Sequence, residues 1–366
     1  MKKVVVGISG GVDSAVTAFL LKQEGYDVIG LFMRNWDSSI NNDIKGHKTN
    51  GNICPQEEDY NDALSVCNTL GIKLHRIDFI KEYWDNVFTY FIEELKKGRT
   101  PNPDVMCNKY IKFDVFIKEA KKLGADFIAT GHYAKVEDSH LYKAKDINKD
   151  QTYFLSYLKN YQLENVLFPL GNYCKEEIRN IARENNLVVA NKKDSTGICF
   201  IGERNFKEFL TNYLPNIEGN IVDVNTNEVV GKHIGLMYYT IGQRKGLNLG
   251  GYKFPYYTVG KKIDDNILYV SNHIDEELLI SNSCLLEDVN LINDDKCEDV
   301  CIKTRYRASD VKANIKYLDS NMAIVTYESI KAVTPGQICV IYKGDLCIGA
   351  GTIKEVYKDS KKMCFY

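Results

Sequence analysis

The first 210 residues alternate between short apolar runs and stretches in which apolar positions follow a helical spacing. The run Lys2–Ile8 is rich in β-branched residues and predicts a buried strand. A glycine-rich turn separates this run from the helical apolar positions Ala15, Val16, Phe19 and Leu20. The next apolar run, "YDVIGLFM", predicts a second strand. This order is typical of a βαβ unit, so we expect the two strands to be parallel.

The same order of elements recurs twice further along the chain. A helix predicted near Tyr60–Leu70 precedes the strand "KLHRIDF", and a helix predicted near Lys109–Leu123 precedes the strand "ADFIATGHY". Repeated helix and strand signals of this kind favour a doubly wound parallel sheet with helices on both faces. We therefore expect an α/β domain over residues 1–210.

The segment 37–59 interrupts this pattern. It is rich in Asn, Asp and Gly and has no sustained period, so it predicts a long loop at the carboxyl end of the second strand. Loops of this length inside a compact domain are usually functional or mobile. A lid over the same sheet end as Gly7–Ser14 and a plain surface insertion both fit the sequence.

After Pro215 the helical spacing nearly vanishes and short alternating strands follow one another. Segments such as "GNIVDVNTNEVVGKHIG" and "YKFPYYTVGKK" predict a small β-rich central domain over residues 211–278. The strands "VCIKTRYR", "ANIKYL", "MAIVTYE", "QICVIYKGD" and "CIGAGTI" then predict a closed C-terminal β-barrel over residues 279–366. The chain has no convincing internal repeat.

Composition and charge limit the class of protein. Hydrophobic residues make up 44% and charged residues 26%, which is ordinary for a globular protein. With a formal net charge of -2, a polyanionic partner must be held by local basic patches. The start "MKKVVVGISG" does not fit a signal peptide, and no apolar run reaches the roughly 20 residues of a membrane span. We expect a cytoplasmic protein, in which the eleven cysteines are mostly buried thiols.

The turn "GISGGVDS" between the first strand and the first helix has the chemistry of a phosphate site. Its glycines let backbone N–H groups point at an anion, and the following helix adds the positive end of its dipole. A Walker loop would require Gly-Lys-Ser or Gly-Lys-Thr, and a dinucleotide fingerprint has a different glycine spacing. The sequence therefore predicts a phosphate or pyrophosphate site that lacks the usual lysine.

Two cysteine segments carry further candidate chemistry. In "GRTPNPDVMCNKYIKF", Cys107 stands at the predicted start of the helix from Lys109, where the helix dipole favours a thiolate. In "KKDSTGICFIGERNF", Cys199 lies in a glycine-containing turn near the cations Lys192, Lys193 and Arg204. A packing role is the alternative for each cysteine.

The loop and both cysteine segments carry a family resemblance. Ser9 to Ser14 is similar to the Ser-Gly-Gly-x-Asp-Ser loop of the ATP pyrophosphatases, which cleave ATP between its α and β phosphates and adenylate a carbonyl oxygen. With the segments "LFMRNWD", "ATGHYAK", "KDQTYFLSYL", "GLMYYTIGQRKGLNLGG" and "KTRYR", essentially the whole chain resembles the bacterial and organellar tRNA-specific 2-thiouridylases. The resemblance implies an adenine nucleotide α-hydrolase-like first domain and two tRNA-binding domains.

The resemblance also implies roles for individual residues. Cys107 would be the nucleophile, Cys199 would carry a persulfide, and Asp104 would move a proton near the base. The ATP site would be formed by Gly7, Ile8, Ser9, Gly10, Gly11, Val12, Asp13, Ser14, Met33 and Gly131. The tRNA would be contacted by Asn102, Pro103, Asp104, Lys149, Asp150, Gln151, Arg305 and Tyr306.

The implied reaction converts the wobble uridine of tRNA to 2-thiouridine, with ATP as cosubstrate, Mg²⁺ balancing the phosphate charge and a persulfide sulfur donor protein as partner. The persulfide on Cys199 attacks the activated carbon directly, or Cys107 first releases hydrosulfide and leaves a Cys107–Cys199 disulfide. An amide-forming ligase and a non-catalytic RNA-binding or sulfur-relay protein are the alternatives. An iron–sulfur cluster on Cys107, Cys199 and a third ligand such as Cys54 is another, although no Cys-x-x-Cys pair is present, and the six histidines show no zinc spacing.

Overall fold

The computed structural model describes residues 1–45, 55–194, 197–199, 201, 205–251, 254–272 and 277–363. Its first domain is built on a five-stranded parallel sheet with the order β3-β2-β1-β4-β7. The strands are β1 (Lys3–Gly7), β2 (Asp27–Arg34), β3 (Lys73–Asp78), β4 (Phe127–Ala129) and β7 (Val166–Leu167). The strand order reverses between β1 and β4, and ligands of doubly wound sheets bind at such a switch point.

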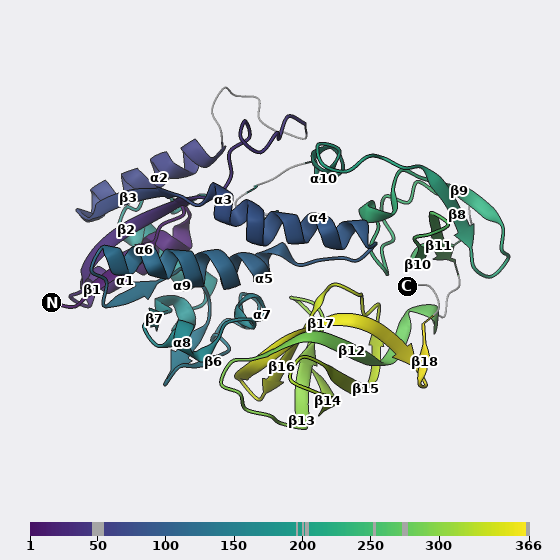
Figure 1. Cartoon of the computed structure of the whole chain (residues 1–366). Coiled ribbons are helices and arrows are strands. Elements are labelled where there is room, and N and C mark those ends of the chain that lie inside the picture. The colour runs from purple at the N-terminus through teal and green to yellow at the C-terminus, as the bar shows by residue number, and fades with distance from the viewer. Residues whose placement is uncertain are drawn as a thin grey trace.

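The central strand β1 explains why the sheet is covered on both faces (Figure 1). Val4 and Val6 point into one core and Val5 into the other, and all three are fully buried. The first core packs against α1 (Val12–Gln23), α2 (Pro55–Leu70) and α9 (Lys175–Glu184). The second core packs against α3 (Ile80–Tyr83), η1 (Trp84–Phe88), α4 (Thr89–Lys96), α5 (Pro103–Cys107), η2 (Asn108–Val115) and α6 (Phe116–Lys122).

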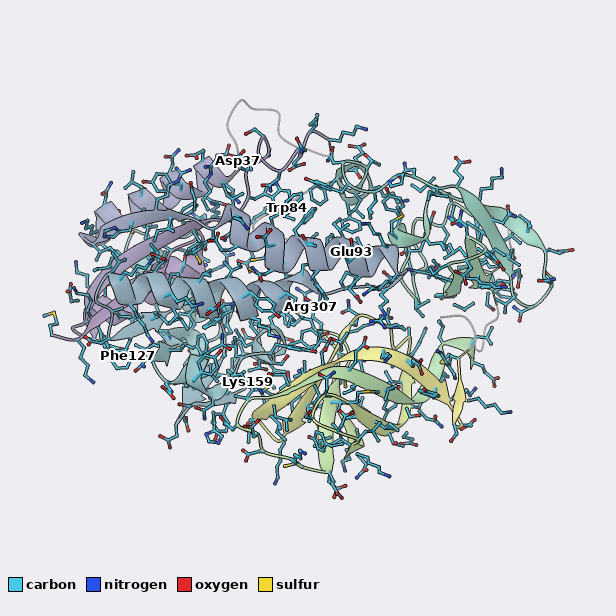
Figure 2. All side chains as sticks on the ribbon, in the orientation of Figure 1. Asp37, Trp84, Glu93, Phe127, Lys159 and Arg307 are labelled. Carbon is cyan, nitrogen blue, oxygen red and sulfur yellow. The ribbon has the colours of Figure 1, made fainter. Side chains whose placement is uncertain are left out.

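The remaining elements of this domain are short. They are β5 (Lys135–Glu137), β6 (His140–Tyr142), α7 (Thr152–Leu155), α8 (Asn160–Leu163), η3 (Pro169–Asn172) and α10 (Phe206–Leu210). An aromatic cluster joins α10 to the second core. Trp84, which is labelled in Figure 2, contacts Tyr213. Phe88 contacts both Tyr213 and Phe209. The cluster fixes the segment that follows Cys199 against the helices of the first domain.

The central domain is a four-stranded sheet with the order β10-β11-β8-β9. Its elements are β8 (Gly219–Asp223), β9 (Val229–His233), η4 (Leu236–Tyr238), β10 (Tyr257–Lys262) and β11 (Ile267–Ser271). The strands fall within the segments that the alternating pattern predicts. Asp223 lies at the end of β8, where it accepts hydrogen bonds from the Asn225 N–H (2.9 Å) and the Tyr256 hydroxyl (3.0 Å).

The last domain is a closed six-stranded barrel, because β12 pairs with both β15 and β17. After η5 (Glu277–Leu279), its strands are β12 (Ile280–Leu291), β13 (Asp299–Lys303), β14 (Val311–Tyr317), β15 (Ala323–Lys331), β16 (Ile338–Lys343) and β17 (Leu346–Lys358), with the short β18 (Lys361–Lys362) beside β17. The fold class is confirmed: a doubly wound parallel sheet is followed by a β-rich central domain and a barrel. The five strands named from the sequence are all present, and β12 is the strand that they lacked.

All three domains meet at the segment Gly98–Thr100, which we call the junction segment. The carbonyl of Gly98 accepts a hydrogen bond from Lys261 Nζ of β10 (2.8 Å). Arg99 pairs with Glu287 of β12 (2.6 Å), and the Thr100 N–H donates to the carbonyl of Pro335 (3.0 Å). The junction segment directly precedes α5, so the position of this helix depends on both β domains.

The first domain and the barrel also share a sheet. The hairpin β5–β6 extends the barrel sheet where β6 pairs with β17, with Leu346 opposite Tyr142. Tyr153 donates a hydrogen bond to the carbonyl of Ile338 (2.9 Å) in the same interface. Within the described ranges, no helix is long and apolar enough to cross a membrane.

Candidate active site

The loop Gly7–Ser14 follows β1 and leads into α1, at the switch point of the sheet. Gly10 has φ 74° and lies so close to Asp59 that a Cβ would come within 2.2 Å of the Asp59 carbonyl oxygen. Ser14 Oγ accepts from the Ser9 N–H (3.1 Å) and holds the loop closed. The N-cap of α1 is Gly11, which has no side chain to occupy the first N–H groups of the helix. This arrangement suits an anion such as a phosphate.

The residues expected around the adenosine lie beside this loop. Met33 is near the end of β2, and its Cε lies 3.6 Å from where a Cβ on Gly7 would be. Gly131 follows β4 and faces the start of α1, where a Cβ would come within 2.9 Å of the Ser14 nitrogen. Both residues therefore sit at the same end of the sheet as the loop.

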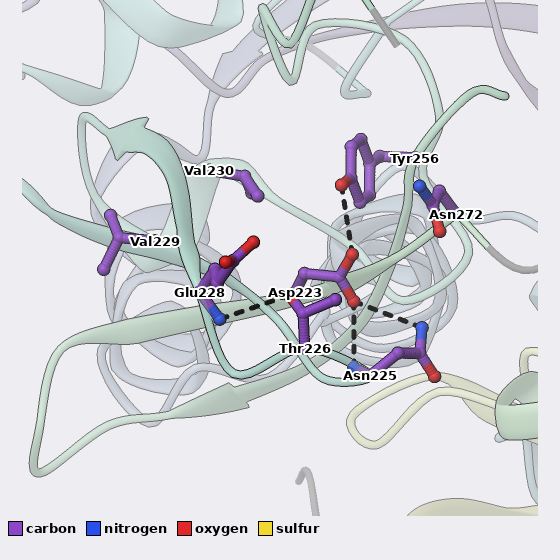
Figure 3. Close-up of a pocket in the computed structure, with 8 residues that line it drawn as sticks. All are labelled: Asp223, Asn225, Thr226, Glu228, Val229, Val230, Tyr256 and Asn272. Atoms are coloured by element: carbon purple, nitrogen blue, oxygen red, sulfur yellow. Dashed lines mark hydrogen bonds between the residues drawn. The ribbon is translucent and has the colours of Figure 1, made fainter. Parts of the chain in front are cut away.

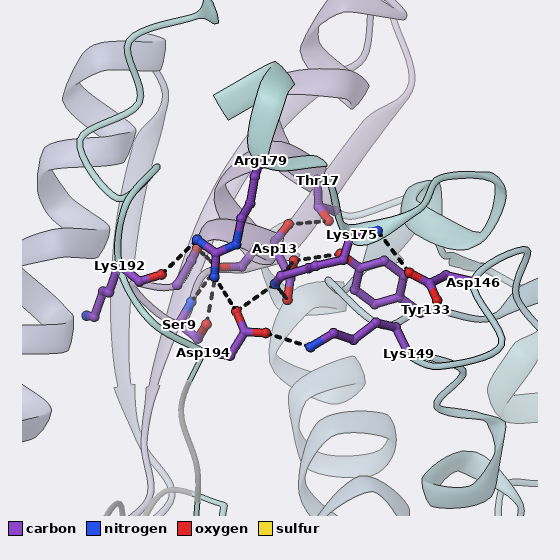
Figure 4. A network of polar contacts seen from close by, with 12 residues as sticks. Ser9, Asp13, Thr17, Tyr133, Asp146, Lys149, Lys175, Arg179, Lys192 and Asp194 are labelled. Carbon is purple, nitrogen blue, oxygen red and sulfur yellow. Dashed lines mark hydrogen bonds and ion pairs between the residues drawn. The ribbon is translucent and has the colours of Figure 1, made fainter. Parts of the chain in front are cut away.

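A network of charges surrounds Asp13 (Figure 4). Lys175 Nζ lies 2.8 Å from both carboxylate oxygens of Asp13 and 2.7 Å from Asp194. Asp194 also pairs with Lys149 (2.7 Å) and Arg179 (2.9 Å). The bonds from Lys149 and Lys175 outweigh burial and lower the pKa of Asp194 to about 2. None of Lys175, Arg179 and Asp194 was singled out from the sequence, since their roles depend on packing between distant segments.

Helix α5 carries the segment Asn102–Cys107. Asn102 is its N-cap and accepts a hydrogen bond from the Val105 N–H (3.3 Å), while Pro103 occupies the first turn. The helix begins at Pro103, six residues before the start at Lys109 that the sequence predicted. The expectation that a helix N-terminus favours a Cys107 thiolate is therefore wrong: Cys107 lies at the end of α5, within a continuous helical run, and is fully buried.

Cys107 and Cys199 come together although 92 residues separate them. The Sγ atoms lie 3.9 Å apart in a thiol–sulfur contact. The backbone of Cys199 is held on both sides: its N–H donates to Asp104 Oδ1 (2.9 Å), and its carbonyl accepts from the Tyr83 hydroxyl (2.8 Å). Asp104 and both cysteines thus form one compact group.

The two cysteines differ in their protonation. The hydrogen bond from Cys107 and the nearby Lys112 lower the pKa of Cys199 despite burial. Burial and the bond to Cys199 raise the pKa of Cys107 well above its ordinary value. Burial also raises the pKa of Asp104. Cys199 is thus the more acidic thiol of the pair, and Cys107 donates the hydrogen bond between them.

Lys112 is the cation of this group. Burial alone would lower the pKa of Lys112, but the charges of Cys199, Cys107 and Asp104 outweigh burial and raise it. The sequence pointed instead to Lys192, Lys193 and Arg204. Lys192 pairs with Asp59 (2.7 Å) and Asp62 (2.5 Å), Lys193 is exposed, and Arg204 lies outside the described residues. Lys112 stands in the quoted segment "NKYIKF", and only the helical geometry singles it out.

His132 connects the cysteine group with the phosphate loop. It directly follows Gly131, which packs against the start of α1. Burial and the charge of Lys112 lower the pKa of His132 well below its ordinary value, so the ring is neutral. Its Nδ1 lies 2.7 Å from Thr130 Oγ1.

The structure places the expected tRNA-binding residues in intramolecular contacts. Besides the pairing of Lys149 described above, the buried Asp150 accepts from the Ala144 N–H (3.0 Å) and Thr152 (2.7 Å), and Gln151 accepts from the Tyr133 N–H (2.9 Å). Arg305 donates to the carbonyls of Ala332 (2.7 Å) and Ile241 (3.2 Å), which ties the barrel to the central domain. Tyr306 packs against Phe154 with ring centroids 4.4 Å apart. Contacts to RNA at these residues stay a prediction.

Cys54 and residues 46–54 of the predicted loop 37–59 lie outside the described residues. Residues 55–59, which the sequence assigned to this loop, form the start of α2. Among the residues that the structure describes, no group of three or more His, Cys, Asp or Glu side chains could hold a metal ion.

A hollow in the central domain is lined by Asp223, Asn225, Thr226, Glu228, Val229, Val230, Tyr256 and Asn272 (Figure 3). The carboxylate of Asp223 is already occupied by its neighbours there.

Family models match all three parts of the chain. The models described as "tRNA methyl transferase HUP domain", "tRNA methyl transferase PRC-barrel domain" and "Aminomethyltransferase beta-barrel domain" match residues 2–203, 207–272 and 281–353. The first match alone spans more than half of the chain.

Curated relatives are similar over nearly their whole length, and each is named "tRNA-specific 2-thiouridylase MnmA". The protein of Mycoplasmopsis synoviae is 56% identical over 367 residues, which cover 100% of this chain and 98% of that protein. The protein of Mycoplasma capricolum is 58% identical over 98% of this chain and 100% of its own. The protein of Staphylococcus saprophyticus is 52% identical over 99% of this chain and 98% of its own.

Proposed function

The chain belongs to the tRNA-specific 2-thiouridylase family, and from this premise we propose how its residues share the reaction. It is a tRNA sulfurtransferase that forms 2-thiouridine in tRNA in an ATP-dependent reaction. The family models describe methyl transfer, whereas the curated relatives are thiouridylases. Sulfur transfer through a persulfide requires two neighbouring thiols, and the Cys107–Cys199 contact provides them.

The cysteine pair is the observation that carries this proposal. Two thiols with Sγ atoms 3.9 Å apart reach the roughly 2.05 Å of a disulfide with a shift of about 2 Å. Cys199 is half-buried and Cys107 is fully buried, so a sulfur donor reaches Cys199 more readily than Cys107. Since a thiolate is the form that attacks a donor persulfide, the lowered pKa of Cys199 supports this cysteine as the persulfide carrier.

ATP activates the uridine for sulfur transfer. We assign the ATP phosphates to Gly7–Ser14 and the adenosine to the side of Met33 and Gly131. The O2 oxygen of uracil attacks the α phosphate, and pyrophosphate leaves. Asp104 takes or returns the proton of the base, because burial raises its pKa toward the working range of a general acid or base. Mg²⁺ would be held mainly by phosphate oxygens and would neutralise phosphate charge, because Lys175 and Tyr133 occupy the carboxylate oxygens of Asp13.

Sulfur transfer ends in the same products by two routes. In the first, the terminal sulfur of the Cys199 persulfide attacks C2 and AMP leaves with the oxygen. Cys107 then attacks the Cys199 sulfur and releases the thiocarbonyl. In the second, Cys107 attacks first and frees hydrosulfide, which then attacks C2. Both routes leave a Cys107–Cys199 disulfide, which two electrons from a thiol reductant must reopen.

Partners and location complete the proposal. We propose that the target is the wobble uridine, held near Asn102, Pro103 and Asp104, and that a persulfide-carrying protein supplies the sulfur. Bound tRNA would contact Lys149, Asp150 and Gln151 in the first domain and Arg305 and Tyr306 in the barrel. The domain limits 1–210, 211–278 and 279–366 and a cytoplasmic location remain part of this proposal.

The test is mass spectrometry of nucleosides after incubation of tRNA with the protein, ATP, Mg²⁺ and a persulfide-loaded carrier protein. We expect 2-thiouridine with the wild-type chain and none with Cys199→Ser. A matched control is Cys301→Ser, which changes a half-buried cysteine in the barrel and should leave the product unchanged.

The alternatives predict different outcomes in the same assay. An amide-forming ligase would be indifferent to Cys199→Ser, and a non-catalytic RNA-binding protein would release no pyrophosphate from ATP in the presence of tRNA. Either result with folded protein contradicts the proposed function.

A further inference from the structure

The loop Gly7–Ser14 has no lysine of its own, although ATP carries several negative charges to it. We propose that Lys175, the first residue of α9, is the phosphate-binding cation of this loop. Asp13 and Asp194 hold its ammonium group beside the loop until ATP takes their place. This inference rests on the proposed function, since it concerns the same ATP site.

The position of Lys175 supports this role. Helix α9 shares the core on the α1 face of the sheet, so its first residue lies over the start of α1. The ammonium group is 2.8 Å from both oxygens of Asp13, a loop residue (Figure 4). The side chain is only 13% exposed, so the surrounding residues hold its ammonium group in place beside the loop. A lysine from α9 thus occupies the place that a Walker loop gives to a lysine of its own chain segment.

The cations of the cluster suit an anionic ligand. Lys149, Lys175 and Arg179 converge on two carboxylates, Asp13 and Asp194. A third carboxylate, Asp146, accepts a hydrogen bond from the Lys175 N–H (3.0 Å), so the charges of the cluster balance. The cluster lies beside the helix start that Gly11 leaves without a side-chain cap. Phosphate oxygens accept the same charge-assisted hydrogen bonds as carboxylates, so a polyphosphate can replace Asp13 and Asp194 as the partner of Lys175.

Lys192 is a poorer candidate for this role. It is held by Asp59 and Asp62, which leave that group with one negative charge in excess. A triphosphate would be repelled more strongly by that group than by the cluster around Lys175, where cations and carboxylates balance.

The competing explanation is that Lys175 only ties α9 to α1. A purely structural ion pair would matter for stability and would not distinguish a phosphorylated ligand from an unphosphorylated one. The experiment therefore compares ATP with adenosine.

Calorimetric titration of the full chain without tRNA measures both ligands. We expect Lys175→Gln to weaken ATP binding about 10- to 100-fold, the range for loss of a charge-assisted bond, and to change adenosine binding less than about two-fold. Lys175→Arg should recover part of the ATP affinity. Lys145→Gln is the matched control, because Lys145 is an exposed lysine that pairs with Glu177 of the same helix. It should bind ATP as the wild type does.

Asp194→Asn provides a second, independent readout should Lys175→Gln fail to fold. It removes a carboxylate that competes with ATP for Lys175, so we expect ATP to bind several-fold more tightly. If Lys175 only ties α9 to α1, ATP should instead bind more weakly or not bind at all. Unchanged ATP affinity in folded Lys175→Gln, or equal losses for ATP and adenosine, overturns the inference. The readout needs no thiolation: selective loss of ATP binding supports Lys175 even if the wild type makes no 2-thiouridine.

Discussion

Lys112 places a positive charge that lowers the pKa of both cysteines of the pair. The residue stands one turn and a half beyond Cys107, and its charge interacts with Cys199, Cys107 and Asp104 together. Without it, the thiolate of Cys199 would lie beside a carboxyl group in an apolar core. Burial of this kind disfavours a thiolate, so the reactivity of Cys199 depends on a residue outside its own segment.

Lys112→Met tests this dependence through the pH profile of alkylation. We expect the apparent pKa of Cys199 to rise, since a nearby opposite charge is lost. Alkylation by iodoacetamide at pH 7, followed at Cys199 by mass spectrometry, should slow about ten-fold or more. Lys118→Met is the control, because Lys118 is exposed on the same helical run and pairs with Asp114. An unchanged profile in Lys112→Met contradicts this role.

Tyr83 holds the other side of Cys199. Tyr83→Phe removes the hydroxyl that donates to the Cys199 carbonyl, a bond worth about 1 kcal/mol. We expect thiolation to slow several-fold while ATP affinity stays the same. Tyr90→Phe is the control, because the buried Tyr90 hydroxyl has no hydrogen-bond partner among the described residues. Equal effects of the two variants on single-turnover thiolation would exclude a positioning role for Tyr83.

At the scale of the elements, the sequence predicted the sheet because the spacing of the apolar residues and the β-branched residue types both indicate strands there. Val4, Val5 and Val6 form a continuous apolar run, as expected for a strand buried on both faces. Strand β12 was missed because its register shifts at three places, which breaks the alternation of polar and apolar positions. One shift lies between Ser281 and Ser283 in its pairing with β15. The other two lie between Leu285 and Leu286 and between Glu287 and Asn290 in its pairing with β17.

The site was predictable only in part, for a related reason. Motifs identify residues that contact a ligand, and Asp104, Cys107 and Cys199 do form one group. Lys112, Tyr83 and Lys175 act through contacts between segments far apart in sequence, and no spacing along the chain encodes such contacts. The sequence predicts this helix only from Lys109, whereas it starts at Pro103, because proline suits the first turn of a helix.

Strand β10 supports a prediction about pH. Burial lowers the pKa of Lys261 to about 7, while the unfolded chain keeps the ordinary lysine value of 10.5. Between these values the unfolded state holds the extra proton, so the free energy of unfolding rises with pH by up to about 1.4 kcal/mol per unit. Below pH 7 the cost of the buried charge is fully present.

Urea unfolding at pH 7, 8 and 9.5 checks this prediction. Lys261→Met should flatten the rise, and the exposed Lys262→Met should keep it. The nearby His233 does not contribute in this range, because burial lowers its pKa below 6.5. Parallel pH profiles for Lys261→Met and the wild type would contradict the assignment.

For the whole molecule, the junction segment makes the active site a property of three domains. Gly336 of the barrel has φ 89° and lies against this segment, where a Cβ would come within 2.8 Å of Arg99 Cβ and 3.0 Å of the Thr100 nitrogen. Gly336→Ala should therefore push the barrel away from the residues that precede α5. We expect a loss of about ten-fold or more in thiolation and unchanged ATP affinity, measured with full-length protein.

Gly344→Ala separates contact from backbone strain. Gly344 is in the same barrel with φ 60°, and nothing lies within 4 Å of its Cβ position. Both substitutions put an alanine into a left-handed backbone conformation, which is strained for a residue with a Cβ. Only Gly336→Ala also adds an atom against the junction segment. Equal activity of the two variants would show that the junction does not control the site.

The contact between Gln337 and the Thr100 carbonyl spans 237 residues of chain. At a synthesis rate of about 5–20 residues per second, roughly 10–50 s pass between the appearance of the two partners at the ribosome. During that interval both cysteines can already exist in a folded first domain, but the residues before α5 lack the support of the barrel. The barrel thus supports the residues before α5, and with them the cysteine pair, only when translation is nearly finished. A prematurely terminated chain is therefore a poor thiolating enzyme.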